Sequence, residues 1–448
     1  MKIQPARRIV GEVSVPGDKS ISHRAAMLSA LGTGRAAISN FATSEDCAST
    51  LRCLSQLGVH IERDRANVII EGVGLQGLRP SAAPLDCGNS GSTMRMLAGI
   101  LAGQDFVSVL TGDESLSSRP MKRIIEPLER MGARISAEDG HAPLRIEGQK
   151  QLRAINCEMK VSSAQVKSCI LLAGLNAKGL TEVVEPQGAT RDHTERMLRW
   201  LGVTVQSRRI ESNGKAAEAI AIEQVEQFNA KDGTVPGDIS SAAFFIAAAA
   251  MLPGSTLEIK GIGLNPTRRA VIPVLRALGV EAQLDFIERD GDWYEEDFLE
   301  PFGNISVRGG AGLAPLKEGE SNVLRGPLIA QLIDELPILA VLGSQVIGGI
   351  QIRDAAELRV KESDRIRATV ENLRAMGAEG IEHEDGLTIP ERANLRGARL
   401  DAHGDHRIAM AFSIGALISE GESEIMGAEC VRVSFPEFFE LLESVVER

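Results

Sequence analysis

Cationic and hydroxyl side chains gather at the start of a predicted helix near the N-terminus. Residues 17–24 read GDKSISHR, and an alanine-rich apolar run follows them. A helix N-terminus attracts anions through its free N–H groups and its dipole, and Lys19, Ser20 and Arg24 add two charges and a hydroxyl. The segment therefore predicts a phosphate or carboxylate site, although a solvated helix cap with incidental charge would have the same sequence.

Five further segments place polar or cationic residues at the start of an apolar, helix-like stretch. Each is weak evidence alone, because a run of charges is usually a solvated face. Six such helix starts in a chain of net charge −12 instead predict a locally cationic site for small, multiply anionic ligands. The five segments are GNSGSTMR (88–95), SRPMKR (118–123), SSAQVKS (162–168), TRDHTE (190–195) and GDHR (404–407).

The C-terminal half supplies carboxylates as well as cations. Asp334 and Glu335 interrupt an otherwise apolar stretch, where a charged pair would be costly to bury without a purpose. Residues 361–365 read KESDR. A helix there would place Lys361 and Arg365 on one face with Glu362 beside them.

In the SRPMKR segment, Pro120 is expected in the first turn of a helix.

Composition disfavours several classes of protein. The chain has 448 residues, 43% of them hydrophobic and 25% charged, which predicts two globular domains of about 200 residues each. No apolar run of about 18 residues occurs, and the N-terminus lacks a secretory signal, so we expect a cytoplasmic protein. The acidic net charge and scarce aromatic residues disfavour nucleic-acid binding. Because the six cysteines form no CxxC pair, we expect reduced thiols and no metal site.

The chain also contains internal repeats. Five predicted helices end in Leu-x-x-(Leu/Met)-Gly, and each closing glycine is expected to adopt positive φ before an alternating strand. These glycines are Gly58, Gly132, Gly202, Gly279 and Gly377, and residues 435–448 resemble a truncated sixth copy. Residues 15–30 and 235–250 share a VPGD turn, which predicts a serine-capped apolar helix in each half. The pattern indicates two similar domains of three repeats each, with chain crossings at the shared turns.

Taken together, these segments resemble the EPSP synthase family. The blocks GDKSISHR, GNSGSTMR, RPMKR, SSAQVKS, RDHTER, DELP, ELRVKESDR and GDHR occur in the order typical of that family and extend over residues 14–437. The resemblance implies an α/β fold of two similar domains, each built from three βαβαββ repeats in an inside-out α/β barrel. It implies one discontinuous domain of residues 1–18 and 236–448, a second of residues 19–235, and an active site in the cleft between them.

The resemblance also implies an activity. The enolpyruvyl group of phosphoenolpyruvate would be transferred to the 5-hydroxyl of shikimate 3-phosphate by addition and elimination, with release of phosphate. This step belongs to the shikimate pathway of chorismate and aromatic amino acid biosynthesis, and it is the target of glyphosate. The two small-molecule substrates are the expected partners, without cofactor, metal, nucleic acid or membrane, and the protein is expected to be a monomer.

Roles for individual residues follow from the same resemblance. Asp334 would accept the hydroxyl proton, Glu362 would serve the methylene carbon, and Lys19 would lie near the transferring oxygen. The residues implied to bind shikimate 3-phosphate are Lys19, Ser20, Arg24, Ser163, Ala164, Gln165, Arg191, Asp334 and Lys361. Those implied to bind phosphoenolpyruvate are Lys19, Gly91, Arg119, Gln165, Arg365 and Arg407.

The chain departs from the family pattern in two places. At Ala164 only the backbone can donate a hydrogen bond. Some members carry a lysine just before a C-terminal Phe-Pro or Tyr-Pro pair. This chain has the pair, Phe435-Pro436, but lacks the lysine, so no role is transferred to Arg432. By contrast, Gly91 fits the family, and its missing side chain would leave room for glyphosate.

Other functions stay open at this point. A UDP-N-acetylglucosamine enolpyruvyl transferase would share the fold, but that family usually has a Cys or Asp on the loop corresponding to GDESLSSRPMKR, which has no Cys. A repeat protein acting on nucleic acid, such as an RNA-end processing enzyme, would need a basic track that this acidic chain lacks. A pure scaffold would not need carboxylates and cations gathered at helix starts.

Overall fold

The computed structural model describes residues 1–448 except 187–189, 213, 287–296, 311, 318 and 321, and the chain divides into two compact units. Unit 1 contains Met1–Pro16, 236–286 and Pro301–Arg448, and unit 2 contains Gly17–Val235 with 297–300. The boundaries differ from the expected ones in two details. Residues 17 and 18 belong to unit 2, and so do residues 297–300, because Phe298 is buried in the hydrophobic core of unit 2. Residues 287–296, expected in the other domain, lie outside the described residues.

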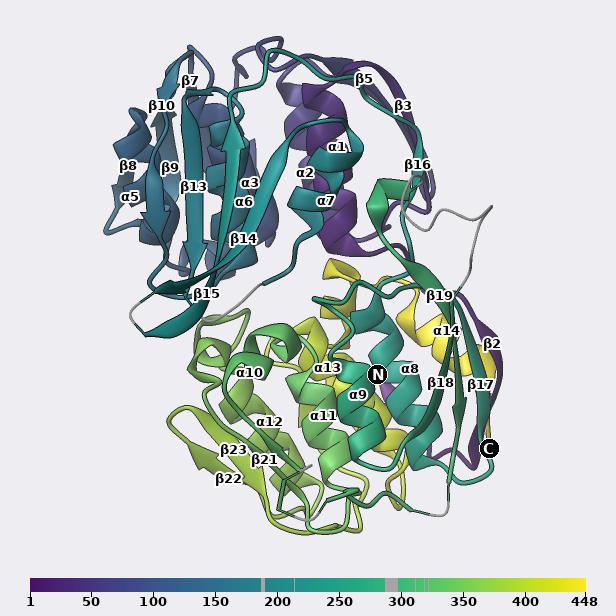
Figure 1. The fold of residues 1–448 in the computed structure, drawn as a ribbon. Helices are drawn as coiled ribbons and strands as arrows, with labels where there is room; N and C mark the ends of the chain where they lie inside the picture. Colours follow the sequence, from purple (N-terminus) through teal and green to yellow (C-terminus); the bar gives the residue numbers. More distant parts are fainter. Residues whose placement is uncertain (187–189, 213, 287–296, 311, 318, 321) are drawn as a thin grey trace. The chain divides into compact units, whose positions relative to one another are not determined.

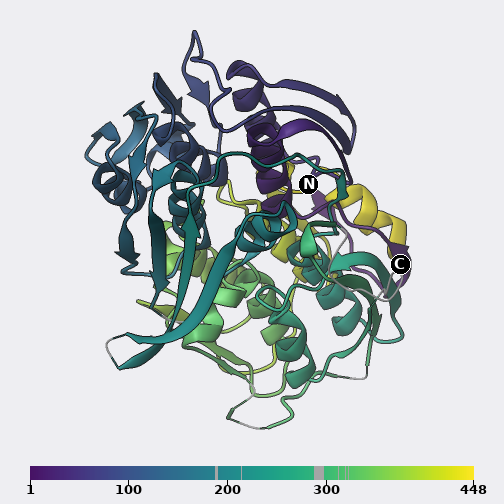
Figure 2. The ribbon, with the colours of Figure 1, turned by 45° about the horizontal axis from the view of Figure 1, so that its top comes forward.

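Unit 2 contains three four-stranded sheets that share one pairing pattern. In each sheet a first strand runs parallel to a second, and the next two strands are added antiparallel. Strands β14 and β15 form a long hairpin (Figures 1 and 2). The sheets are β16 (Gly233–Thr234), β3 (Thr33–Ser39), β5 (Asn67–Val73) and β4 (His60–Asp64); β6 (Leu85–Asp86), β7 (Val107–Thr111), β9 (His141–Glu147) and β8 (Arg134–Glu138); and β11 (Asn156–Glu158), β13 (Leu180–Glu185), β15 (Lys215–Glu223) and β14 (Val205–Ser212), with β10 (Leu152–Arg153) and β12 (Ala177–Lys178) as a separate pair.

The helices of unit 2 supply much of its core. Helices α1, α3 and α6 are buried along nearly their whole length, and α3 packs against both α1 and α6. The helices are α1 (Lys19–Leu31), α2 (Glu45–Gln56), α3 (Gly91–Ala102), α4 (Glu114–Ser117), α5 (Lys122–Met131), α6 (Ala164–Gly174) and α7 (His193–Trp200), with a 3-10 turn, η1, at Asp297–Leu299. Three of the polar segments predicted at helix starts, those before α1, α3 and α6, therefore stand at the N-terminal ends of buried helices.

Unit 1 repeats the same pairing pattern in the sheet that begins with β20, where one parallel pair is followed by two antiparallel ones. Its buried helices α8, α11 and α13 pack against one another. The sheets are β18 (Glu281–Phe286), β19 (Phe302–Arg308), β17 (Thr256–Gly263), β2 (Arg8–Val13) and β26 (Val446–Glu447); β20 (Val323–Leu324), β21 (Ile350–Ile352), β23 (Gly386–Ile389) and β22 (Ile381–His383); and β1 (Lys2–Ile3), β25 (Ser423–Met426) and β24 (Arg399–Asp401). The helices are α8 (Ile239–Met251), α9 (Val271–Ala277), α10 (Pro327–Leu332), α11 (Leu336–Gly343), α12 (Arg365–Ala375), α13 (His406–Leu417) and α14 (Phe438–Val445), with 3-10 turns η2 (Ala356–Val360) and η3 (Ala428–Val433).

The predicted helix ends are confirmed in their backbone geometry. The five closing glycines follow α2, α5, α7, α9 and α12 with φ of 91°, 113°, 84°, 89° and 89°. A residue with a Cβ would be strained there, so glycine ends each helix at low cost.

Two expectations about helix starts are wrong. The VPGD turns are capped by Asp18 and Asp238, whose carboxylates accept from the backbone N–H of Ile21 and Ser240, and not by a serine. Pro120 lies before α5, which begins at Lys122, and not in its first turn.

Two expectations about the whole chain can be compared with the structure. All six cysteines are free, and five are buried, which confirms the prediction of unpaired thiols. Among the described residues, no helix combines the length and apolarity needed to cross a membrane.

Candidate active site

The start of α1 forms the first cluster of predicted residues, in unit 2. Asp18 caps the helix, and Lys19 is its first residue. The Lys19 ammonium lies 2.6 Å from a carboxylate oxygen of Asp46, in the first turn of α2, and both side chains are largely buried. Asp46 was not predicted as a site residue. It holds the ammonium in one place with an ion pair.

Arg24, one turn further along α1, is held from three directions. Its Nε donates to Thr194 Oγ1 at 2.7 Å, its Nη2 donates to Ser168 Oγ at 2.7 Å, and its Nη1 donates to the carbonyl oxygen of Ser20 at 2.8 Å. Burial lowers the pKa of Arg24 to about 10, with Arg191 contributing and Glu195 opposing. Arg24 thus remains a cation near neutral pH.

Arg191 joins this cluster from the segment before α7. Its Nη1 donates to Ser20 Oγ at 3.4 Å. The structure therefore brings together Ser20, Arg24 and Arg191, which the family resemblance implies to be binders of shikimate 3-phosphate. Two arginines and a hydroxyl at a helix start are suited to this task, because guanidinium groups bind phosphate through directed, charge-assisted hydrogen bonds.

The starts of α6 and α3 meet through Gln165. Ser163 caps α6, and Ala164 and Gln165 are its first two residues. Gln165 Oε1 accepts from Arg95 Nη1 at 2.6 Å, and Gln165 Nε2 donates to Ser92 Oγ at 2.9 Å. Sequence reasoning assigned no role to Arg95, although it lies four residues after Gly91 and thus on the same helix face.

Gly91 is the first residue of α3 and is closely approached by two arginines. A Cβ built there would lie 2.7 Å from Arg95 Nη1 and 3.5 Å from Arg119 Nη1. Arg119 is itself held by Asn89 Oδ1 at 2.7 Å and Ser115 Oγ at 3.0 Å. A side chain at residue 91 would therefore displace a guanidinium.

Arg365 is the centre of the second cluster, in unit 1. It is only 1% exposed, and it faces three carboxylates, with Asp405 at 2.8 Å, Glu362 at 2.6 Å and Asp334 at 3.4 Å. Burial alone would lower the pKa of Arg365, but the carboxylates raise it well above its usual value. The guanidinium therefore stays charged. It holds the carboxylates of Asp334 and Glu362, the two predicted catalytic residues, next to its own nitrogen atoms.

Arg407 and Lys361 complete this cluster. Arg407 Nη1 donates to the backbone oxygen of Asp334 at 2.9 Å, and its Nε lies 3.6 Å from Asp334 Oδ1. Burial lowers the pKa of Lys361, and the carboxylate of Asp334 opposes that effect. Lys361 is not helical, because α12 begins at Arg365 after the cap Asp364. The expected same-face pair of Lys361 and Arg365 on one helix is therefore wrong, although both belong to the cluster.

Asp405 is the residue of this cluster that sequence reasoning missed. It is fully buried, caps α13, and accepts from the backbone N–H of Arg407 at 2.9 Å. Burial tends to raise the pKa of Asp405, but Arg365 more than offsets this and holds it below its usual range. The available signal was an aspartate directly before the helix in GDHR.

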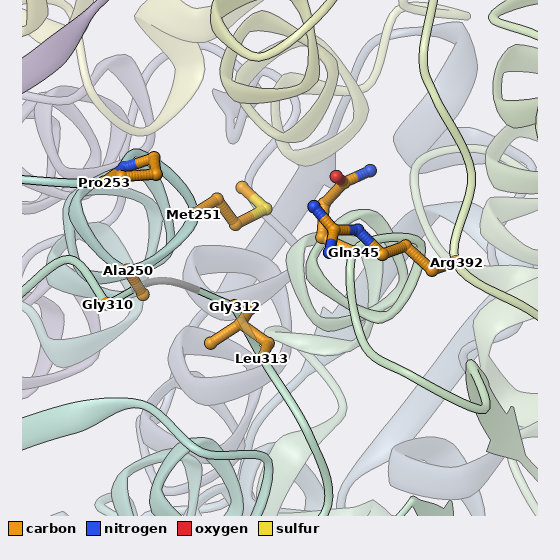
Figure 3. Close-up of a pocket in the computed structure, with 8 residues that line it drawn as sticks. All are labelled: Ala250, Met251, Pro253, Gly310, Gly312, Leu313, Gln345 and Arg392. Carbon is orange, nitrogen blue, oxygen red and sulfur yellow. The ribbon is translucent and has the colours of Figure 1, made fainter.

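Unit 1 also contains a pocket, whose lining residues are drawn in Figure 3. It adjoins the C-terminal end of α8, and none of the predicted site residues lines it. Its lining residues are Ala250, Met251, Pro253, Gly310, Gly312, Leu313, Gln345 and Arg392.

The two clusters have different chemical abilities. In unit 2, arginine, lysine, hydroxyl and amide groups at helix starts can hold phosphate and carboxylate groups. In unit 1, Asp334 and Glu362 can exchange protons while Arg365, Arg407 and Lys361 supply positive charge. Together they provide what a reaction between two anionic substrates needs.

The chain also matches known proteins along nearly its whole length. The family model of EPSP synthase (3-phosphoshikimate 1-carboxyvinyltransferase) matches residues 3–442. A protein named 3-phosphoshikimate 1-carboxyvinyltransferase from Koribacter versatilis (strain Ellin345) is 50% identical, over 100% of this chain and 99% of its own length. One of the same name from Salinibacter ruber (strain DSM 13855 / M31) is 48% identical, over 99% of this chain and 98% of its own. A solved EPSP synthase structure from Acinetobacter baumannii has a TM-score of 0.83 and 39% identity, covering 99% of this chain and 98% of that chain. With half of its residues shared with a full-length relative, the chain belongs to the EPSP synthase family.

Proposed function

We propose that this chain transfers the enolpyruvyl group of phosphoenolpyruvate to the 5-hydroxyl of shikimate 3-phosphate and releases phosphate. As a member of its family it is a transferase of the shikimate pathway, which leads to aromatic amino acids. The observation that carries the proposal is the Arg365 cluster, because it gathers Asp334 and Glu362 beside the cations Lys361 and Arg407. The alternative substrate, UDP-N-acetylglucosamine, is not favoured by the names of the relatives.

Shikimate 3-phosphate is proposed to bind through the cluster of unit 2. Ser20, Arg24 and Arg191 would hold its phosphate, because Arg24 donates to the carbonyl oxygen of Ser20 and Arg191 donates to its hydroxyl, so the three residues meet at one helix start. Ser163, the backbone of Ala164 and Gln165 would add donors at the start of α6. Lys19, Asp334 and Lys361 are assigned to the ring and its reacting hydroxyl.

Phosphoenolpyruvate is proposed to bind with its two anionic groups on arginines. Arg119, Arg365 and Arg407 would hold its carboxylate and phosphate, with Lys19 and Gln165 beside them. Gly91 would let the ligand approach the backbone at the start of α3. The positions of the family blocks and the arginine contacts in the two clusters support these assignments.

The chemistry is proposed to run as addition followed by elimination. In the addition, the 5-hydroxyl oxygen bonds to C2 of phosphoenolpyruvate, Asp334 takes the hydroxyl proton, and Glu362 gives a proton to the methylene carbon. In the elimination, Glu362 takes a proton back from the resulting methyl group as the C2–O bond to phosphate breaks. The departing phosphate takes up the proton that Asp334 accepted, so both carboxyl groups return to their starting states. Lys19 and the arginines would stabilise the negative charge that leaves with phosphate.

Phosphate release from phosphoenolpyruvate tests this function directly. The purified protein is assayed with and without shikimate 3-phosphate, with no metal or nucleotide added. Release that requires shikimate 3-phosphate is the expected result. Release only with UDP-N-acetylglucosamine would assign the other substrate, and no release with either would contradict the proposed reaction.

The finer features of fold and setting are proposals as well. The repeated pairing pattern of the sheets supports two domains of three βαβαββ repeats in an inside-out α/β barrel, whose residues act on the same two substrates. The free cysteines support a cytoplasmic location, because thiols persist in reducing compartments. We propose a monomer as the working form, which sedimentation of the purified chain would test.

A further inference from the structure

Three ionisable side chains form a buried cluster next to the proposed phosphate site. The ammonium of Lys167, on α6, lies 2.7 Å from a carboxylate oxygen of Glu185, on β13, and 2.7 Å from one of Glu195, on α7. The exposed fractions of the three side chains are 1%, 0% and 3%. None of them has a role in the reaction proposed above. We call this cluster the Lys167 triad.

The Lys167 triad is costly to bury. Burial tends to lower the pKa of Lys167, but the two carboxylates more than offset it and leave the pKa above its usual value. Burial raises the pKa of Glu195, and Lys167 opposes that effect. The triad therefore keeps three ionisable side chains away from water. Buried ion groups of this kind often stabilise a fold no better than apolar side chains of the same volume. Stability alone is a weak reason to bury the triad. The residues that it contacts therefore indicate what else it does.

One set of neighbours leads to Arg191. The backbone N–H of Thr190 donates to Glu185 Oε2 at 3.2 Å, and the Thr190 hydroxyl donates to Glu185 Oε1. Arg191 is the next residue, and α7, which carries Glu195 in its first turn, begins two residues later. The backbone on both sides of Arg191 is thus attached to the triad.

The other set of neighbours leads to Arg24. Ser168 follows Lys167 on α6, and Thr194 precedes Glu195 on α7. Their hydroxyls lie 2.7 Å from each other, and each accepts a hydrogen bond of 2.7 Å from Arg24. Since Lys167 joins α6 to α7 one residue away from this contact, it sets the separation of the two hydroxyls that hold the Arg24 guanidinium.

A second buried pair anchors the same turn of α7. His193 Nδ1 lies 2.7 Å from Glu300 Oε1, and both side chains are fully buried. Three successive residues, His193, Thr194 and Glu195, therefore each have a polar contact with a different segment of unit 2. A short turn held in this way leaves little freedom for Arg191 just before it.

We propose that Lys167, Glu185 and Glu195 are positioning residues for the phosphate group of the sugar-like substrate. They hold the hydroxyls of Ser168 and Thr194 on Arg24, and they hold the backbone that carries Arg191. This inference rests on the proposed function, since it concerns how that site distinguishes shikimate 3-phosphate from shikimate. It assigns the preference for the phosphate to three side chains that do not touch the substrate.

A double variant tests the proposal without leaving an unpaired lysine. Lys167→Met with Glu195→Leu removes one charge of each sign, so the remaining charge is that of Glu185, which keeps both hydrogen bonds from Thr190. We expect kcat/KM for shikimate 3-phosphate to fall by about a hundredfold, the scale of an error of about 1 Å in a positioned group. For shikimate, which lacks the phosphate, kcat/KM should change by less than about threefold.

Two further variants separate positioning from stability. Arg208→Met removes the ion pair with Glu182 between β14 and β13 of the same sheet without touching α6 or α7, and the ratio of the two kcat/KM values should stay unchanged. Glu195→Gln keeps the shape and a hydrogen-bond acceptor for Lys167, so it should retain most of the preference. It also replaces the double variant if the latter does not fold, and the ratio should then fall by only about threefold, a small part of the hundredfold loss expected of the double variant.

The outcomes distinguish failure of the proposed function from failure of the positioning role. If the wild-type protein releases no phosphate with shikimate 3-phosphate, the proposed function itself fails. If the wild type is active and the variants of the Lys167 triad keep the full preference for shikimate 3-phosphate while their melting temperatures fall, the triad is only structural and the inference is wrong. A lost preference in a protein that melts within a few degrees of the wild type supports it.

Discussion

Helices α1 and α8 begin with the same turn, yet they present opposite chemistry at their first residues. Each follows Val-Pro-Gly-Asp, is capped by the aspartate and is buried along its length. In α1 the cap is followed by Lys19, with His23 and Arg24 one turn later. At the equivalent positions α8 has Ile239, Ala243 and Phe244. Each cation, and the histidine, is replaced by an apolar residue.

The serine shared by the two helices shows what this replacement does. In α1, Ser20 accepts a hydrogen bond from Arg191, and the neighbouring Lys19 ammonium pairs with the carboxylate of Asp46 from α2. In α8, the equivalent Ser240 donates to the carboxylate of Glu335, which is fully buried, and Arg268 donates to both. The protein's own carboxylate thus occupies the start of α8.

This difference explains how one backbone motif serves two purposes. A capped helix N-terminus favours negative charge wherever it occurs. If the chain provides that charge, the helix start becomes a fixed part of the core. If the chain provides cations as well, an anionic ligand is favoured at the helix start. Adjacent to Glu335, Asp334 faces the cations of unit 1, so the internal ion pair also fixes the turn that carries the proposed base.

The largest effect is expected from removing the ligand-binding charge of α1. Lys19→Met converts the start of α1 towards the α8 pattern, and kcat/KM for phosphate release should fall by about a thousandfold, the cost of losing one preorganised donor to a developing negative charge. Steady-state kinetics with both substrates measures it. Loss of less than tenfold would mean that the first residue of α1 does not distinguish the two helices.

The converse change in α8 should affect stability. Glu335→Ala leaves a buried guanidinium at Arg268 without this carboxylate, and the free energy of unfolding should fall by about 3 kcal/mol. Urea denaturation measures the loss, and Glu335→Gln, which keeps an acceptor for Ser240, should lose less. If neither variant were destabilised, the Glu335 contact would be dispensable and the contrast with α1 would be weaker.

Binding of shikimate 3-phosphate and catalytic turnover should depend on residues of different units. Asp334→Ala and Glu362→Gln should each lower kcat by about a hundredfold, because a general acid or base is lost. The dissociation constant of shikimate 3-phosphate should change by only a fewfold, since its phosphate is assigned to the arginines of unit 2. Calorimetric titration and turnover of the same preparations provide the two numbers. Near-normal turnover in both variants would remove the assignment.

A smaller effect is expected at the start of α3. Gly91→Ala places a Cβ 2.7 Å from Arg95 Nη1 and 3.5 Å from Arg119 Nη1, so one guanidinium must move. We expect the concentration of glyphosate that halves activity to rise by about tenfold or more, because a displacement of about 1 Å is costly for a tightly held ligand. Inhibition curves for wild type and variant at equal phosphoenolpyruvate would show it, and superimposable curves would refute the placement of Gly91.

The smallest effect concerns His23, which has no counterpart in α8. Burial, helped by Lys19 and Arg24, lowers the pKa of His23 well below its usual value, and the ring contacts Thr50 Oγ1 at 2.7 Å. Below about pH 6.5 the unfolded chain therefore binds a proton that the folded one does not. The free energy of unfolding should fall as the pH drops from 7 to 6, by up to about 1.4 kcal/mol per unit from this group. Urea denaturation should show a weaker pH dependence in His23→Gln, and equal slopes would contradict the assignment.

Features set by residue type along the chain could be predicted from the sequence. The five helix-ending glycines adopt positive φ because few other residues tolerate it. The cap residue was predicted less well, since aspartate and serine both cap helices and stand close together in VPGDKS. Which of them caps depends on where the backbone becomes helical, as Asp364 also shows by delaying α12 until Arg365.

Features set by partners in space could be predicted only in part. The family blocks bring Ser20 to Arg191 and Asp334 to Arg365, as expected for residues at converging helix starts. Asp46 and the Lys167 triad were missed, because no local pattern shows which acidic residue a lysine will meet after folding. The three members of the triad lie on two helices and a strand.

The short segment that carries Phe298 and Glu300 affects how the protein can be divided into fragments. Its flanking strands β18 and β19 belong to unit 1, yet Phe298 packs edge-on against Trp200 and Glu300 contacts His193 in unit 2. A gene fragment encoding residues 17–235 alone would therefore leave an unfilled cavity beside Trp200 and an orphaned imidazole. Expression of unit 2 as a separate domain should require residues 297–300 to be supplied, either fused through a linker or added as a peptide.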